Sequence, residues 1–210
     1  MEREMSQRVA QRTDALERVV ASLRHQASRD PLTGLHNRRM LDRHLPALVD
    51  RARRMGLGMA IVMLDLDHFK CLNDTLGHAA GDDFLRTVGQ LIRSSMRSDD
   101  LAFRYGGDEF AVVLHDGGEE AARRLARRLT FLVDGVARSI RIPKPLGISA
   151  GVALLSREGD TGAEGLLDAA DRDLYRAKAV RREGLAPAPA DAPPANVKSV
   201  VVRKMSAARS

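Results

Sequence analysis

The fold of this chain is decided by the stretch Leu101-Ala102-Phe103-Arg104-Tyr105-Gly106-Gly107-Asp108-Glu109-Phe110-Ala111-Val112-Val113-Leu114. Two short runs rich in apolar and aromatic residues flank Gly-Gly-Asp-Glu, a pattern that predicts two β-strands joined by a tight turn. Glycine tolerates positive φ and lets the backbone approach a ligand closely, because it has no Cβ atom. Taken alone, the acidic pair after the glycines fits a plain turn and a binding site equally well.

Helices and strands alternate around this hairpin. Apolar periodicity predicts helices over residues 37–54, 80–96, 119–133 and 164–181. Pro46 is expected to bend the first of them. Apolar runs predict further strands over residues 58–66, 139–142 and 147–155. We therefore expect an α+β domain in which helices flank a central, mostly antiparallel sheet.

The two ends of the chain differ from this domain, which we expect to span residues 30–184. Residues 1–29 contain neither Pro nor Gly, and their apolar residues recur at spacings of three, four and seven. They predict a helix that either forms a short coiled-coil stalk or lies on its own domain. Residues 185–210 are basic and rich in Ala and Pro, which predicts a disordered tail.

Composition excludes several classes of function. The net charge is +6, but residues 181–210 carry +4 of it, so that the near-neutral body argues against nucleic-acid binding. Cys71 is the only cysteine, so that neither an intramolecular disulfide nor a multi-cysteine zinc site can form. Without a signal-peptide core or an apolar run of membrane-spanning length, we expect a soluble, cytoplasmic chain with no membrane segment.

A second acidic pair follows the most apolar strand of the chain. The run over residues 58–64 is apolar throughout and ends in Asp65-Leu66-Asp67. Side chains alternate along a strand, so that Asp65 and Asp67 face the same way and the Leu66 carbonyl is available as a further oxygen ligand. Mg²⁺ commonly takes one or two carboxylates and completes its shell with water and substrate phosphate. The end of this strand is therefore a candidate Mg²⁺ site.

Further motifs accompany the two acidic pairs: Asp30-Pro31-Leu32-Thr33-Gly34-Leu35-His36-Asn37-Arg38-Arg39, Phe69-Lys70-Cys71-Leu72-Asn73-Asp74-Thr75-Leu76-Gly77-His78-Ala79-Ala80-Gly81-Asp82, Ile148-Ser149-Ala150-Gly151-Val152, Ala170-Asp171 and Tyr175-Arg176-Ala177-Lys178. Together with Asp65 and the hairpin, they resemble the GGDEF family of diguanylate cyclases in order, spacing and residue type. The resemblance covers about residues 30–182 and implies a fold similar to the palm of nucleotide cyclases.

The resemblance implies a bacterial enzyme of second-messenger signalling that condenses two GTP into cyclic di-GMP and releases pyrophosphate. Each protomer of a homodimer would hold one GTP, and the 3′-hydroxyl of each GTP would attack the α-phosphate of the other. Positioning of the two nucleotides and neutralisation of charge by the metal would supply most of the catalysis.

The resemblance also implies a metal site. Asp65, the Leu66 carbonyl and Asp108 match the ligands of Mg²⁺, with Mn²⁺ as the alternative cation. Glu109 matches an additional metal or nucleotide contact, and Asp108 and Glu109 are the implied catalytic residues. Asp108 also matches the position of the catalytic acid or base. The sequence does not show whether Asp108 binds the metal or transfers the proton, and the two roles compete because a metal-bound carboxylate is a weak base.

For GTP, Asn73 and Asp82 match the pair that reads guanine, because an amide and a carboxylate together recognise the O6, N1 and N2 edge that adenine lacks. Helix capping is the alternative role of both residues. The further implied GTP contacts are Lys70, Gly106, Gly107, Lys178 and Arg182. Arg182 has the expected spacing but lacks the Gly-Arg-Asn context of many family members, so that a solvated helix end is its alternative role.

A separate signal implies an inhibitory site for the product. Arg97, Asp100 and Arg128 match the residues that bind cyclic di-GMP in the family, and arginine suits this task because its planar fork grips phosphate with two hydrogen bonds. An exposed arginine paired with a neighbouring acid is the alternative for Arg97. For the whole chain, the alternatives to an active cyclase are a catalytically silent module that binds cyclic di-GMP or GTP, and a dimerising output domain of a larger sensor.

Overall fold

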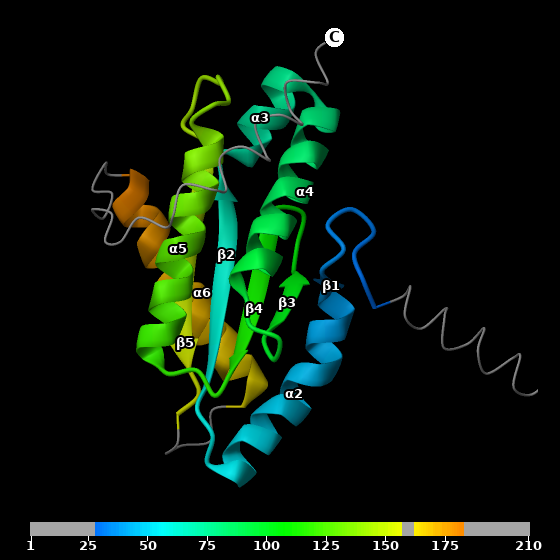
Figure 1. The fold of residues 1–210 in the computed structure, drawn as a ribbon. Coiled ribbons are helices and arrows are strands. Elements are labelled where there is room, and N and C mark those ends of the chain that lie inside the picture. Colours follow the sequence, from blue (N-terminus) through cyan, green and yellow to red (C-terminus); the bar gives the residue numbers. More distant parts are fainter. Residues whose placement is uncertain (1–27, 157–161, 183–210) are drawn as a thin grey trace, which may run out of the picture.

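The computed structural model describes residues 28–156 and 162–182 of the chain. Within these residues, five strands and five helices follow one another (Figure 1). The strands are β1 (His36–Asn37), β2 (Met59–Asp67), β3 (Leu101–Arg104), β4 (Glu109–His115) and β5 (Gly147–Leu154). The helices are α2 (Arg38–Met55), α3 (Phe69–Leu76), α4 (His78–Ser95), α5 (Glu119–Ala137) and α6 (Ala163–Arg182).

The strands form one sheet in the order β1-β3-β4-β2-β5. The short β1–β3 pair is parallel, and the other three pairs are antiparallel. β3 and β4 form the predicted hairpin, and β2 lies between that hairpin and β5. The expectation of an α+β domain with a mostly antiparallel sheet is therefore confirmed.

Helices cover both faces of the sheet, and the alternation of side chains along β2 divides the core into two parts. Even-numbered residues such as Leu64 pack with α4 and α5, whereas odd-numbered residues such as Met63 pack with α2 and α6. Figure 1 shows α4 and α5 in front of the sheet and α6 behind it. Because burial of one such side chain contributes about 1.5–3 kcal/mol, both layers are needed for stability.

Two helices follow β2, although the sequence predicted one helix over residues 80–96. His68, at φ 60°, precedes α3, and Gly77, at φ 85°, separates α3 from α4. Glycine adopts such a φ without strain, so that the chain can turn sharply there. α3 has eight residues and buries only Leu72 fully, which leaves too little periodicity for prediction.

The predicted strand over residues 139–142 is wrong. The N–H groups of Ser139 and Ile140 donate to the carbonyls of Val136 and Ala137, at 3.2 and 2.9 Å, and so continue the end of α5 as a turn. These donors are not free for a strand ladder. The apolar alternation has another cause, since Ile140 and Ile142 pack against the α4–α5 side of the core.

The predicted N-terminal helix and C-terminal tail lie outside the described residues. Among the described helices, none combines the length and the apolar character that crossing a membrane requires.

Candidate functional site

The candidate site lies where β2 ends beside the turn of the hairpin. Asp65 and Asp67 occupy odd-numbered positions of β2 and contact α6. Asp65 is paired with Glu109 across β2 and β4, so that both carboxylates point to the same face of the sheet. The Leu66 N–H donates to the Asp108 carbonyl at 3.1 Å and ties the turn to the strand. The two acidic pairs of the sequence are therefore neighbours in the structure.

The turn is held by backbone hydrogen bonds and by one arginine. The N–H groups of Tyr105 and Gly106 both donate to the Glu109 carbonyl, at 2.8 and 3.1 Å. Arg104 donates from Nε and Nη2 to the Gly107 carbonyl, at 3.2 and 2.7 Å. Neither glycine of the turn has positive φ. Glycine at position 106 instead allows the Glu109 carboxylate to lie close to the backbone, because a Cβ atom there would collide with it.

Arg104 also connects the turn with the start of the domain. Its Nη1 lies 3.1 Å from Asp30 Oδ2, and the two side chains are only 16% and 15% exposed. Burial opposes ionisation of Asp30, but the hydrogen bonds from Thr33 and the charge of Arg104 prevail and lower the pKa of Asp30. One guanidinium group therefore joins Asp30 to the backbone of Gly107.

Two basic side chains of α6 face the carboxylates of β2. Lys178 Nζ lies 2.7 Å from Asp65 Oδ2, and Arg181 Nε lies 3.0 Å from Asp67 Oδ2. The Ser149 hydroxyl of β5 donates to the Asp67 carboxylate, with its oxygens at 2.9 and 3.0 Å. Asp65 and Asp67 thus each have a cationic partner.

Negative charge nevertheless predominates at the turn. Burial raises the pKa of Asp65, and the charges of Asp108 and Asp67 raise it further, whereas Lys178 opposes this shift. Burial also raises the pKa of Glu109, reinforced by the charges of Asp65 and Asp108. The like-charged carboxylates repel one another, so that an additional cation at this position would be stabilising.

The oxygen atoms at the end of β2 and at the turn suit Mg²⁺ better than they suit a metal whose ligands all come from the protein. Within residues 28–156 and 162–182, no three His, Cys, Asp or Glu side chains form a cluster that could hold a metal. Mg²⁺ needs no such cluster, because water and substrate phosphate usually fill most of its six positions. Asp65 and Asp108, with the Leu66 carbonyl, supply the hard oxygen atoms that this ion prefers.

The residues predicted to read guanine lie on α3 and α4. Asn73 Oδ1 is buried and has no hydrogen-bond partner among the described residues, and a Cβ atom on Gly81 would collide with it. Asp82 is exposed on α4, and Lys70 is exposed in the first turn of α3. His68 and Gly77 occupy the N-cap positions of α3 and α4, so that neither Asn73 nor Asp82 caps the N-terminus of a helix. The capping alternative is therefore wrong.

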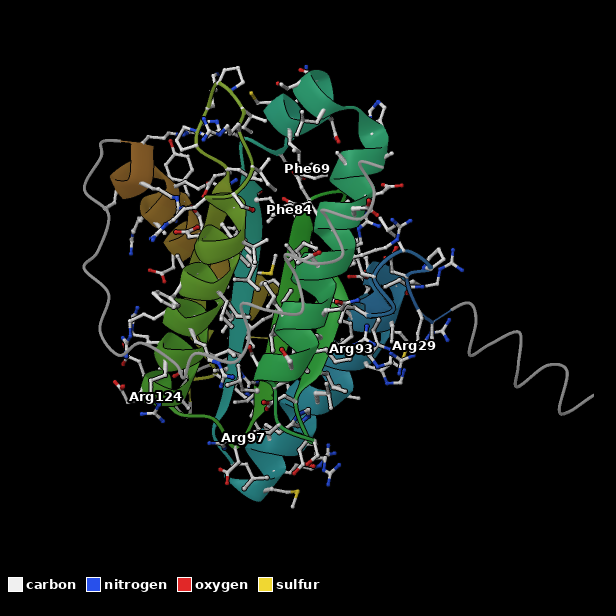
Figure 2. All side chains as sticks on the ribbon, turned by 45° about the horizontal axis from the view of Figure 1, so that its top comes forward. Arg29, Phe69, Phe84, Arg93, Arg97 and Arg124 are labelled. Atoms are coloured by element: carbon white, nitrogen blue, oxygen red, sulfur yellow. The ribbon has the colours of Figure 1, made fainter. Side chains whose placement is uncertain are left out.

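The residues predicted for the inhibitory site begin at the other end of α4. Arg97 is exposed just after that helix, and Figure 2 shows it at the opposite end of the domain from Phe69, the first residue of α3. Arg128 is exposed on α5, which packs against α4. Asp100 is buried, and its Oδ2 accepts a hydrogen bond of 3.0 Å from the Arg97 N–H. Asp100 therefore shapes the turn that presents Arg97.

Sequence reasoning missed Arg181 and selected its neighbour Arg182, which is exposed at the end of α6. Arg181 follows Lys178 by three residues and Arg182 follows it by four, so that both lie near the helix face of Lys178 and spacing alone does not choose between them. Asp67 likewise follows Asp65 by two residues and lies on the same strand face. Asp134 of α5, which bonds to Arg181, gave no local signal because it comes from a distant segment.

Comparison with known proteins agrees with this geometry. A family model described as "Diguanylate cyclase, GGDEF domain" matches residues 27–184. The chain is 40% identical over 159 residues to response regulator PleD of Caulobacter vibrioides, and this match covers 74% of this chain and 35% of PleD. It is 41% identical over 157 residues to diguanylate cyclase DgcS of Shewanella oneidensis, covering 75% of this chain and 51% of DgcS. It thus spans only about a third to a half of these relatives.

A solved structure has the same fold. The coiled coil and GGDEF domain of DgcB from Caulobacter crescentus, in complex with c-di-GMP, superposes with a TM-score of 0.73 at 27% identity. The match covers 86% of this chain and 95% of that one. The family match over residues 27–184 and the shared fold lead to one conclusion. The chain belongs to the GGDEF family.

Proposed function

We propose that this chain is a diguanylate cyclase, which joins two GTP molecules into one cyclic di-GMP and releases two pyrophosphates. The observation that carries the proposal is the meeting of Asp65, Asp108 and Glu109 at one end of the sheet, with Lys178 bonded to Asp65 at 2.7 Å. An intact turn, a buried carboxylate and a phosphate-binding cation are the groups that a nucleotidyl transfer requires.

Each of the two steps forms and breaks one phosphorus–oxygen bond. The 3′-oxygen of one GTP attacks the α-phosphorus of the other, and the bond from that phosphorus to the bridging oxygen breaks. Pyrophosphate leaves with the electron pair of the broken bond. The hydroxyl proton passes to a carboxylate, and Glu109 suits this role because burial and neighbouring charges raise its pKa. Asp108 is the second candidate, from the adjacent position of the turn.

The proposed Mg²⁺ would be held by Asp65, the Leu66 carbonyl and Asp108, with Glu109 nearby; Mn²⁺ has the same ligand preferences. When bound, the metal would neutralise charge on the phosphates. Lys178 would then exchange part of its contact with Asp65 for the triphosphate, since an ammonium group binds phosphate as a point charge. Lys70 and Arg182 are exposed cations that we assign to the same triphosphate.

Guanine recognition is assigned to Asn73 and Asp82. A buried amide oxygen without a partner in the described part of the chain is costly unless a ligand supplies a donor. The N1 and N2 groups of guanine are such donors, and the Asp82 carboxylate is a second acceptor. Adenine would leave these groups unpaired, so that GTP should be preferred over ATP.

One copy of the domain offers one such site, so that the complete reaction needs a homodimer in which each copy holds one GTP. Product inhibition is assigned to Arg97, Asp100 and Arg128. The two exposed arginines would bind the phosphates of cyclic di-GMP, and Asp100 would fix the turn that carries Arg97.

The test is conversion of GTP by the full chain with Mg²⁺, followed by mass spectrometry at several protein concentrations. We expect cyclic di-GMP at a specific activity that rises with protein concentration, because the dimer is the active form. Asp108→Ala should abolish product while circular dichroism stays unchanged. Asp82→Ala should reduce the preference for GTP over ATP, whereas its exposed neighbour Asp83→Ala serves as the matched control. Binding of GTP without any product would instead support a catalytically silent module.

A further inference from the structure

All three guanidinium nitrogens of Arg181 are bonded to other elements of the fold. Nε lies 3.0 Å from Asp67 Oδ2, Nη2 lies 2.6 Å from Asp134 Oδ1, and Nη1 donates to the Ile148 carbonyl at 3.1 Å. The three partners belong to β2, α5 and β5. Glycine at position 147 leaves room for this arrangement, because a Cβ atom there would collide with Arg181 Nη2. The guanidinium group thus occupies a fitted site between three elements.

These bonds matter because the last two turns of α6 have little other attachment. The fully buried residues of this helix are Leu166, Ala170 and Leu174, and none follows Leu174. Lys178 and Arg181 lie beyond that point, on the face that meets the end of β2. Hydrophobic packing therefore fixes the first part of α6, and the Arg181 contacts fix its last part.

The spacing links Arg181 to Lys178. Three residues along a helix advance about 4.5 Å, and two residues along a strand advance about 6.6 Å. Lys178 and Arg181 can therefore face Asp65 and Asp67 as two neighbouring ion pairs, at 2.7 and 3.0 Å. If the Arg181 pair is removed, the Lys178 ammonium loses the anchor that sets its position along β2.

Arg181 itself is poorly suited to bind a nucleotide phosphate. Its three nitrogen atoms already bond to two carboxylates and one carbonyl, and the charges of Asp67 and Asp134 more than balance its own. A phosphate would have to displace these partners and face both carboxylates. The exposed Arg182 has no such restriction.

We propose that Arg181 is a positioning residue for the GTP site: it holds the last turns of α6 on β2, β5 and α5, and thereby places Lys178 where the triphosphate binds. This inference rests on the proposed function. It assigns to Arg181 an effect on nucleotide affinity that acts through Lys178 and not through direct contact.

The experiment is a double-mutant cycle of Arg181→Met and Lys178→Met in the full chain. The ligand is α,β-methylene GTP with Mg²⁺, in which carbon replaces the bridging oxygen and prevents turnover, and calorimetry gives its Kd. We expect Arg181→Met to weaken binding about tenfold when Lys178 is present and less than twofold when Lys178 is replaced, a coupling within the range seen for interacting residues. Arg176→Met, an exposed arginine of the same helix, should leave the Kd unchanged.

An equal loss in both Lys178 backgrounds, or no loss in either, would overturn the inference. If Arg181→Met does not fold, Asp134→Asn replaces it in the cycle, because it removes the charge of one Arg181 partner outside the predicted site. It should weaken binding about threefold with Lys178 present, again by coupling. Failure of the wild type to bind the GTP analogue would refute the proposed function together with the inference, whereas binding with an additive cycle refutes the inference alone.

Discussion

Replacing Gly151 with alanine tests how closely α6 must approach the sheet. A Cβ atom there would collide with two backbone atoms of α6, Leu174 N and Ala170 O, and would lie 2.6 Å from Leu174 Cα. Ordinary contact begins at 3.4 Å, so that clearing Leu174 Cα alone requires α6 to retreat by about 0.8 Å, and the two nearer backbone atoms require a larger movement. Backbone atoms cannot rotate away as a side chain can. We therefore expect the free energy of unfolding to fall by about 1–3 kcal/mol.

The same movement would affect the site, because Lys178 lies one helical turn after Leu174. A retreat of at least that size would lengthen its 2.7 Å contact with Asp65 to about 3.5 Å or more, which is longer than a charge-assisted hydrogen bond. Since misplacement of a positioned group by about 1 Å can cost about 100-fold in rate, we expect cyclic di-GMP formation to fall by roughly 10- to 100-fold.

The assays are thermal unfolding and GTP conversion, with Gly135→Ala as the matched control. Gly135 is exposed in α5, and nothing lies within 4 Å of a Cβ atom there. Alanine at this position should therefore stabilise the helix by about 0.5–1 kcal/mol. Gly151→Ala should lower the Tm by roughly 2–12 °C. If Gly151→Ala unfolds at the temperature of the wild type and keeps full activity, the close approach is not required and the reasoning fails.

Three further predictions concern the turn, the start of the domain and the inhibitory site. Glu109→Gln should abolish activity yet raise the Tm of the metal-free protein at neutral pH. Because the pKa of Glu109 is raised in the folded protein, its ionisation lowers stability as pH rises above 4.5, so that the gain in Tm of the variant should vanish below that pH. A lower Tm of the variant at pH 7 would contradict this. Asp30→Ala should cost about 1.5–3 kcal/mol by removing the partner of Arg104. Denaturation of the wild type and the variant at several pH values measures this difference in the free energy of unfolding. Because the pKa of Asp30 is lowered, the difference should disappear as pH falls below 3.8, and a difference that stays constant with pH would exclude the ionised pair as its cause. Arg97→Ala should leave initial rates unchanged and relieve inhibition by added cyclic di-GMP at least tenfold, and unchanged inhibition would remove Arg97 from that site.

The sequence predicted the parts of the fold that depend on local pattern. The hairpin followed from two apolar runs around a turn, and α5 began at the predicted residue 119. β1 has only two residues and therefore carries no periodicity of its own. The segment over residues 139–142 was misassigned because its apolar alternation reflects packing against the core and not strand pairing. Local pattern shows that a side chain is buried, but not which backbone groups are already bonded.

The same limit applies to the candidate site. The meeting of Asp65 with Glu109 was predicted only through the family resemblance, because alternation places Asp65 and Asp67 on one face of a strand but does not show which strand pairs with it. The role of Arg181 was not, because it depends on Asp134 of α5 and on the space at Gly147, which are far apart in sequence. The expected spacing in α6 indicated Arg182, since spacing along a helix does not show which of two adjacent arginines turns inward.

The alternation along β2 has a consequence for protein engineering. Leu64 and Leu66 belong to the α4–α5 side of the sheet, whereas Asp65 and Asp67 belong to the α6 side. A library that varies only the β2 residues on the α4–α5 side would therefore change thermal tolerance while Asp65 and Asp67 keep their partners on α6. A library of the β2 residues on the α6 side would change metal and triphosphate binding together with stability, so that selection for stability and selection for binding should begin from opposite faces of the same strand.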